Sequence, residues 1–123
     1  MITEHISTIL YIVAPITGIV SLQFFIPKLF AKKVLNMDLQ SGLPTFYFAH
    51  WGLVVCALAI LLYLAASNEA LRTPVIAVTL MEKAALAIWV FADIKKPYTK
   101  KMLPAALFDA VVSVVFTLYL LGY

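Results

Sequence analysis

The sequence predicts an all-α integral membrane protein, built as a four-helix bundle. Of its 123 residues, 64% are hydrophobic and only 12% are charged, which leaves too little polar surface to cover a water-soluble globule. The apolar residues form four runs, and each is close to the roughly 20 residues that a helix needs to cross about 30 Å of hydrocarbon. Because little chain remains outside these runs, we expect a single transmembrane domain over residues 1–123 and no separate soluble catalytic unit.

The first span is predicted over residues 6–27 and contains a proline. Pro15 removes one hydrogen bond from the helix and crowds the preceding turn, so we expect a kink. Ala14 and Gly18 are both small and lie one turn apart, which lets a neighbouring helix approach closely. No Lys or Arg precedes this span, which argues against a cleaved signal peptide.

Residues 28–44 connect the first span to the second and are predicted to form a short amphipathic segment. Apolar residues such as Leu29 and Val34 are interleaved with Lys28, Lys32 and Lys33. This pattern is typical of a segment that lies on the headgroup layer of a membrane. The second span is then predicted over residues 45–66, and aromatic residues open it, as is common at membrane–water interfaces.

The third and fourth spans are predicted over residues 74–92 and 102–119. Pro74 falls in the first turn of the third span, where its missing N–H costs little. Residues 93–101 connect the two spans and carry four lysines, whereas residues 28–44 carry three. Arg72 is the single basic residue on the opposite side of the predicted membrane.

The placement of the basic residues predicts the orientation. Positively charged loops stay preferentially on the cytoplasmic side, so loops 28–44 and 93–101 should be cytoplasmic and both termini outside. We therefore expect a multi-pass protein of the bacterial inner membrane. The formal net charge of +3 is confined to segments that flank apolar runs, so the lysines are interpreted as membrane anchors and no nucleic-acid partner is expected.

The candidate functional residues are the polar side chains inside the spans: Gln23, His50, Glu82, Lys83 and Asp109. A central Asp, Lys or Arg costs about 2.5–3.5 kcal/mol on insertion scales, so such groups face the protein interior and pair. A helical rise of about 1.5 Å per residue places His50 and Asp109 roughly 10 Å, and Glu82 and Lys83 roughly 15 Å, from the cytoplasmic edge. The four ionisable groups can therefore meet at one level.

Glu82 and Lys83 are adjacent and point about 100° apart around the helix axis, so they require different partners. The most economical pairing joins Lys83 to Asp109 and Glu82 to His50, with Gln23 as a nearby donor or acceptor. Three interpretations stay open. The network can fix helix register alone, it can border a pocket for a lipid, a quinone or another hydrophobic ligand beside the aromatic residues near His50, or it can form a proton or ion pathway.

Sequence signatures of catalysis and cofactor binding are absent. The chain has no HExxH, no GxSxG, no phosphate-binding glycine loop and no run of His and acidic residues at metal-binding spacing. Packing with one hydrogen bond is the ordinary role of a residue such as His50, and metal or haem ligation is the rarer one. We expect no metal, no catalytic residue and no intrinsic cofactor, with a lipid or quinone as the expected bound molecule.

Short motifs mark the second, third and fourth spans, namely His50, Trp51 and Gly52, then Arg72, then Glu82 and Lys83, then Asp109. With these motifs the chain resembles the DoxX-like group of small bacterial four-helix membrane proteins. Some members of that group are named as small membrane subunits of sulfur-oxidising, quinone-reducing complexes. The resemblance implies a bundle that binds a hydrophobic redox partner or supports a larger assembly, and it supplies no catalytic residues.

The sequence thus favours an accessory or structural subunit of a membrane assembly, with a redox assembly as one option. Its expected partners are membrane lipid and either a larger membrane complex or further copies of the chain. Two alternatives from other classes stay open. One is a small proton-coupled transporter that uses Glu82, Lys83 and Asp109, and the other is a small membrane enzyme that acts on a lipid-like substrate through His50 and Glu82.

Overall fold

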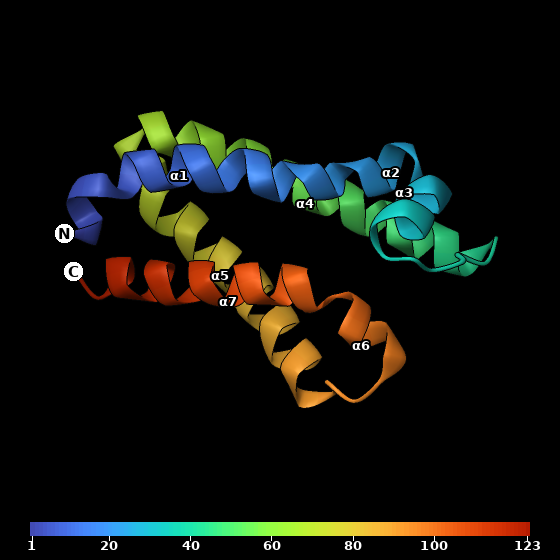
Figure 1. Ribbon diagram of the computed structural model, residues 1–123. Coiled ribbons are helices and arrows are strands. Elements are labelled where there is room, and N and C mark those ends of the chain that lie inside the picture. Colours follow the sequence, from blue (N-terminus) through green and yellow to red (C-terminus); the bar gives the residue numbers. More distant parts are fainter.

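The computed structural model describes residues 1–123 and contains helices but no strands (Figure 1). Four helical stretches are long and apolar enough to cross a membrane. Each predicted span overlaps one of these stretches, which confirms the all-α class and the presence of four long apolar helical stretches. The stretches are Ile2–Phe25, Leu43–Ser67, Glu69–Ala92 and Leu103–Leu120.

The first stretch is not one regular helix. It consists of α1 (Ile2–Gly18), the 3₁₀ turn η1 (Ile19–Ser21) and α2 (Leu22–Phe25). Pro15 lies inside α1, and the α-helix ends soon after it, at Gly18. A Cβ added to Gly18 would lie 3.6 Å from the Cβ of Ala59. The small residues at these two positions therefore let α1 approach the second stretch closely.

A short helix follows the first stretch, where an amphipathic segment was expected. Ile26 has a φ of −136° and ends α2, and Pro27 then occupies the first turn of the next helix, α3 (Pro27–Val34). Phe30 and Ala31 are buried, whereas the lysines of α3 are exposed. Gly42, with a φ of 87° that glycine adopts without strain, precedes the second stretch, α4 (Leu43–Ser67).

Only Asn68 separates α4 from α5 (Glu69–Ala92). Its side chain accepts a hydrogen bond of 3.1 Å from the backbone N–H of Ala70 and so caps α5. Arg72 donates hydrogen bonds of 3.1 and 3.0 Å to the carbonyls of Ala65 and Ala66, which satisfies the end of α4. The third helix therefore begins five residues before its predicted start at residue 74.

The fourth stretch is preceded by a short helix, α6 (Pro97–Lys101), and is itself α7 (Leu103–Leu120). Thr99 is fully buried in the turn between α5 and α7. Its hydroxyl donates hydrogen bonds to the carbonyls of Asp93 and Lys96, so it fixes the path of the chain into α6. α7 packs along α5.

The two ends of the molecule differ in the chain segments that they carry. At the terminal end, both chain termini lie beside the α4–α5 turn, and the Thr3 N–H donates a hydrogen bond of 3.0 Å to the Tyr123 carbonyl (Figure 1). At the basic end lie α3 and α6 with their lysines. Lys101 donates a hydrogen bond of 2.8 Å to the Asn36 carbonyl there.

The shared hydrophobic core lies toward the terminal end. It takes residues from α1, α4, α5 and α7, and its largest fully buried side chains include Leu10, Leu62, Ile76 and Phe116. Towards the basic end the chain separates into a first hairpin, α1 to α4, and a second hairpin, α5 to α7. Neither α2 nor α3 packs against α5, α6 or α7, and Figure 1 shows α5 leading away from α4.

Candidate functional site

Lys83 and Asp109 form a buried ion pair between α5 and α7, as the sequence predicted. The Lys83 Nζ lies 2.7 Å from the Asp109 Oδ1, and the two residues are only 3% and 5% exposed. The Phe108 ring centroid lies 5.1 Å from the same Nζ, on the same helix as Asp109. The ammonium group is therefore held by a carboxylate and by the face of an aromatic ring.

Helical periodicity brings this pair together. The buried residues of α7 recur every three or four positions, as Ala106, Asp109, Val112 and Phe116. Those of α5 recur in the same way, and Lys83 lies on its buried stripe between Thr79 and Ala87. Because these stripes face each other along the packed pair of helices, a lysine and an aspartate at matching depths have to meet.

Glu82 is part of the same layer but lacks a partner. It is partly buried, and its Oε2 atom is inaccessible and accepts no hydrogen bond. The layer thus holds two carboxylates, Glu82 and Asp109, and one ammonium, Lys83, so its full ionisation leaves one excess negative charge. Thr79, one turn away from Glu82 on α5, has a buried hydroxyl that also makes no hydrogen bond.

Glu82 faces the side from which the first hairpin departs. It lies two helical turns after Val75, on nearly the same face of α5. Val75 belongs to the core that joins both hairpins, so that face points toward the first hairpin. The buried core residues of α5 are Val75 and Ile76, and the helix then leads away from α4 (Figure 1). The unpartnered carboxylate therefore lies where the contact between the hairpins ends.

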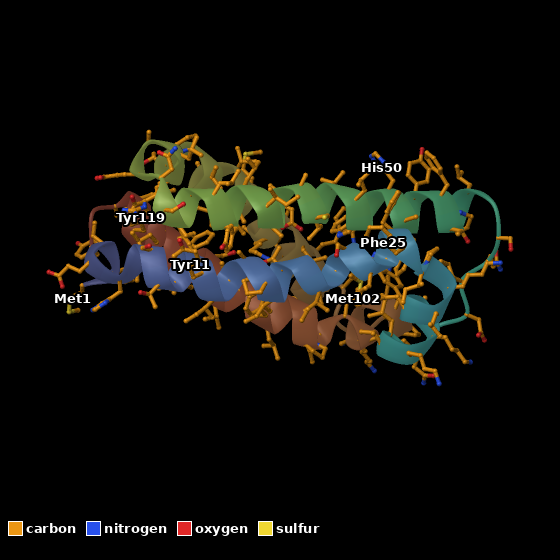
Figure 2. All side chains as sticks on the ribbon, turned by 90° about the horizontal axis from the view of Figure 1, so that it is seen from above. Met1, Tyr11, Phe25, His50, Met102 and Tyr119 are labelled. Atoms are coloured by element: carbon orange, nitrogen blue, oxygen red, sulfur yellow. The ribbon has the colours of Figure 1, made fainter.

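The expected pairing of Glu82 with His50 is wrong: no hydrogen bond or ion pair joins them. His50 is exposed on α4 and projects away from the other helices (Figure 2). The buried stripe of α4 includes Gly52 and Val55, and His50 lies about 200° around the axis from Gly52. Depth along the helix alone had placed His50 beside Glu82, and its rotation about the axis places it outside.

His50 belongs instead to an exposed aromatic group on α4. Its ring stacks on that of Phe46, with centroids 6.1 Å apart and an interplanar angle of 8°. Tyr47 contacts Phe46 edge to face at 5.5 Å. Phe46 and Tyr47 are 62% and 61% exposed. These rings form the aromatic surface that the sequence predicted, but they do not line an interior wall beside the ion pair.

Gln23 is buried in the first hairpin, away from the ion pair. Its Nε2 donates a hydrogen bond of 3.2 Å to the Phe48 carbonyl on α4. Gly52 makes this contact possible, because an added Cβ there would lie 2.7 Å from the Gln23 Cβ and from the Phe24 nitrogen. Gln23 thus fastens α2 to α4, and the glycine of the His-Trp-Gly motif has a packing role.

A shallow groove of about 500 Å³ lies between α5 and α7, and sequence reasoning missed it. It lies at the level of the ion pair, since Ala84 and Ala110 of its lining directly follow Lys83 and Asp109 in the chain. The signal for it was the small residues on both helices, which leave space between the backbones. Its lining residues are Ala84, Ala87, Ile88, Phe91, Ala110 and Ser113.

No three His, Cys, Asp or Glu side chains come together at a spacing that could hold a metal ion.

Compared with known proteins, the chain matches no family model, no curated protein and no solved structure. The resemblance to DoxX-like proteins therefore stays a prediction.

Proposed function

We propose that this chain is a multi-pass membrane protein that serves as a non-catalytic subunit of a membrane assembly and holds a hydrophobic molecule, a lipid or a quinone, against α5. One observation carries the proposal. The Glu82 Oε2 atom is buried and accepts no hydrogen bond, at the level where the first hairpin leaves α5. In hydrocarbon such an oxygen is costly. Because Glu82 as a whole is only partly buried, a bound molecule can donate a hydrogen bond to its carboxyl group once the side chain turns outward.

A hydroxyl group is the donor that suits this position. Quinols and many lipids carry hydroxyl groups next to long apolar tails, so a molecule of this kind can place a hydroxyl at Glu82 and keep its tail in the surrounding hydrocarbon. The Lys83–Asp109 pair holds α5 on α7 and so fixes the face that carries Glu82. In this proposal the ion pair is structural and Glu82 is the binding group.

The orientation in the proposal follows the lysines. Seven of them lie at the basic end, in the segments 28–33 and 95–101. The preference of lysine-rich loops for the cytoplasm supports a basic end inside and both termini outside. A bacterial inner membrane with the aromatic surface of α4 at its cytoplasmic interface is consistent with this orientation. Glu82 then lies in the cytoplasmic half of the membrane.

Native mass spectrometry of the protein in mild detergent tests the proposal. We expect the wild-type chain to carry an adduct with the mass of a lipid or quinone, or to be retained in a larger complex. The Glu82→Leu variant should lose the adduct, while Glu69→Leu, at an exposed glutamate of the terminal end, should keep it. A wild-type monomer without any adduct would overturn the proposal.

A proton-coupled carrier is the second candidate, and the charge count in the layer favours it. Lys83 neutralises only one of the carboxylates of Glu82 and Asp109, so one proton restores neutrality. Reconstituted liposomes with a pH dye inside distinguish the candidates. A carrier should move protons in a way that Glu82→Gln abolishes, whereas a non-catalytic subunit should leave the internal pH unchanged. The enzyme alternative lacks support, because His50 and Glu82 do not meet.

A further inference from the structure

The basic end of the molecule carries a dense and unbalanced set of charges. Seven lysines lie there against two acidic residues, so five positive charges are uncompensated within the chain. Both hairpins contribute to the set. The first hairpin supplies Lys28, Lys32 and Lys33, and the second supplies Lys95, Lys96, Lys100 and Lys101, while the acidic residues are Asp38 and Asp93.

Only part of this charge is used inside the protein. Lys32 lies 3.1 Å from Asp38, and Lys96 lies 3.8 Å from Asp93. Lys28 donates to the Ser41 hydroxyl at 2.6 Å, and Lys101 donates to a backbone carbonyl. The remaining lysines are exposed and make no hydrogen bond or ion pair, and they are Lys33, Lys95 and Lys100.

One contact joins the segments of the two hairpins that carry the lysines. Lys101 of α6 donates a hydrogen bond of 2.8 Å to the Asn36 carbonyl, just after α3. Asn36 has a φ of 50°, in the left-handed region that asparagine tolerates better than most residues. The bend at Asn36 thus places the end of α3 against α6, although the helices themselves do not pack. Segments that carry lysines therefore meet from both hairpins at the basic end.

Large apolar side chains are exposed next to these lysines. Leu29 and Val34 on α3 are 52% and 59% exposed, and Phe25, just before α3, is 69% exposed. Ile94 and Tyr98 occupy the corresponding place beside the lysines of the second hairpin, and both are 40% exposed. A surface that offers positive charge and apolar side chains together matches a phospholipid, which has an anionic head and acyl chains. A soluble polyanion would use only the lysines.

We propose that the basic end binds anionic phospholipids, with headgroups lying across α3 and the turn between α5 and α7 so that they contact both hairpins. Here we call this the lysine surface, meaning the seven lysines named above with the apolar residues beside them. The proposal goes beyond the proposed function, because its ligand is a headgroup at the membrane surface and not a molecule beside Glu82. The charge complementarity between lysine ammonium groups and lipid phosphates carries it.

Lipid retention in native mass spectrometry tests the lysine surface. The full chain is incubated in detergent with equal amounts of phosphatidylcholine and phosphatidylglycerol. We expect the wild type to retain phosphatidylglycerol several-fold over phosphatidylcholine, and this preference should weaken as salt screens the charges. Equal retention of the two lipids by the wild type would overturn the proposal.

A pair of triple variants separates charge from folding. Lys33→Gln, Lys95→Gln and Lys100→Gln together remove the three free ammonium groups, and we expect the preference to fall clearly below that of the wild type. The matched Lys→Arg triple keeps the charge and should keep the preference. Circular dichroism should give all three proteins the same helical content. A glutamine triple that retains the wild-type preference contradicts the proposal.

Inorganic phosphate separates a lipid site from a plain anion site. If the lysine surface uses headgroup and acyl chains together, excess inorganic phosphate at constant ionic strength should leave the retained phosphatidylglycerol unchanged. Displacement of the lipid by phosphate alone would overturn the assignment to a lipid. The Glu82→Leu variant should lose the adduct that co-purifies beside α5 but should still prefer the added phosphatidylglycerol, so a failure here is distinct from a failure of the proposed function.

Discussion

At the terminal end, α1, α4, α5 and α7 all contribute to one core, whereas at the basic end each hairpin packs mainly on itself. The core residues of the terminal end are almost all aliphatic, with alanines such as Ala65 and Ala66 at the close approaches. The buried polar residues lie beyond that core, with Gln23 in the first hairpin and the Lys83–Asp109 pair in the second.

This difference shows how each end fixes the packing of its helices. Lipid solvates apolar side chains well, so a packed aliphatic core is stabilised by close contact and small residues. Where the hairpins separate, each holds its own two helices with a buried polar contact, which in hydrocarbon has few alternative partners. The terminal end therefore joins the hairpins to each other, and the polar contacts fix the register within each hairpin.

The largest expected effect comes from breaking the second hairpin at its ion pair. Asp109→Leu leaves the Lys83 ammonium buried without its carboxylate, and breaking one side of a buried pair costs about 3–5 kcal/mol. We expect a clear fall in the detergent melting temperature. The Lys83→Met/Asp109→Leu double variant removes both charges and should recover most of that loss.

Hydrogen exchange can show whether this loss stays within one hairpin. In Asp109→Leu, amide protection should fall in the parts of α5 and α7 near the basic end, while α2 and the adjoining part of α4 keep theirs. Equal loss of protection in both hairpins would mean that the basic end is not divided in two. An unchanged melting temperature would show that the ion pair does not stabilise the fold.

The next effect is expected at the terminal end. Phe116 is fully buried in the core that joins the hairpins, and Phe116→Ala opens a cavity there. Because lipid offers little hydrophobic drive between helices, we expect a loss of about 2–3 kcal/mol, below the usual range for soluble proteins. In contrast to Asp109→Leu, protection should fall in both hairpins, as hydrogen exchange would report.

A smaller effect is expected from Gly52→Ala in the first hairpin. The new Cβ would lie 2.7 Å from the Phe24 backbone nitrogen, so α2 and α4 have to move apart, at a cost of about 1–3 kcal/mol. Gly18→Ala is the matched control, because its Cβ would meet Ala59 at an ordinary 3.6 Å. Melting temperatures that fall equally in the two variants would contradict this contact.

The smallest effect is expected from His50→Ala. The side chain is exposed and stacks on one ring, so its loss should change the unfolding free energy by about 0.5 kcal/mol or less. A detergent melting curve measures this. A large loss of stability would mean that His50 is buried in the working protein, as it would be if α4 packed there against a partner.

The sequence predicts most of the fold because hydrocarbon permits few choices. Four apolar runs of spanning length have to become helical, and each predicted span overlaps one of the four long helical stretches of the structure. Hydropathy does not predict the boundaries where polar residues continue a helix. Glu69 and Arg72 belong to α5, although hydropathy alone starts that span at residue 74. An asparagine cap sets the helix start, and hydropathy does not detect caps.

The candidate site is predictable in part, for a physical reason. Depth follows from counting residues, and a buried lysine requires an acid, so the Lys83–Asp109 pair was predictable. Rotation about each helix axis is set by packing along its whole length. That rotation turns His50 outward and places Gln23 beside a carbonyl of α4. Counting residues along a helix gives the depth of a side chain but not this rotation. The Glu82 Oε2 atom lacks a partner because of both its depth and its rotation about the helix axis.

The hydrogen bond between Thr3 and Tyr123 places the two ends of the chain next to each other. A short linker from Tyr123 to Met1 could therefore close the chain, and new ends could be opened between residues 36 and 42, where the backbone is not helical. Such a circular permutant would keep every helix of the fold. Its new ends would lie at the basic end of the molecule, across the membrane from Met1 and Tyr123. A fluorescent tag attached to one of them would report whether the basic end faces the cytoplasm.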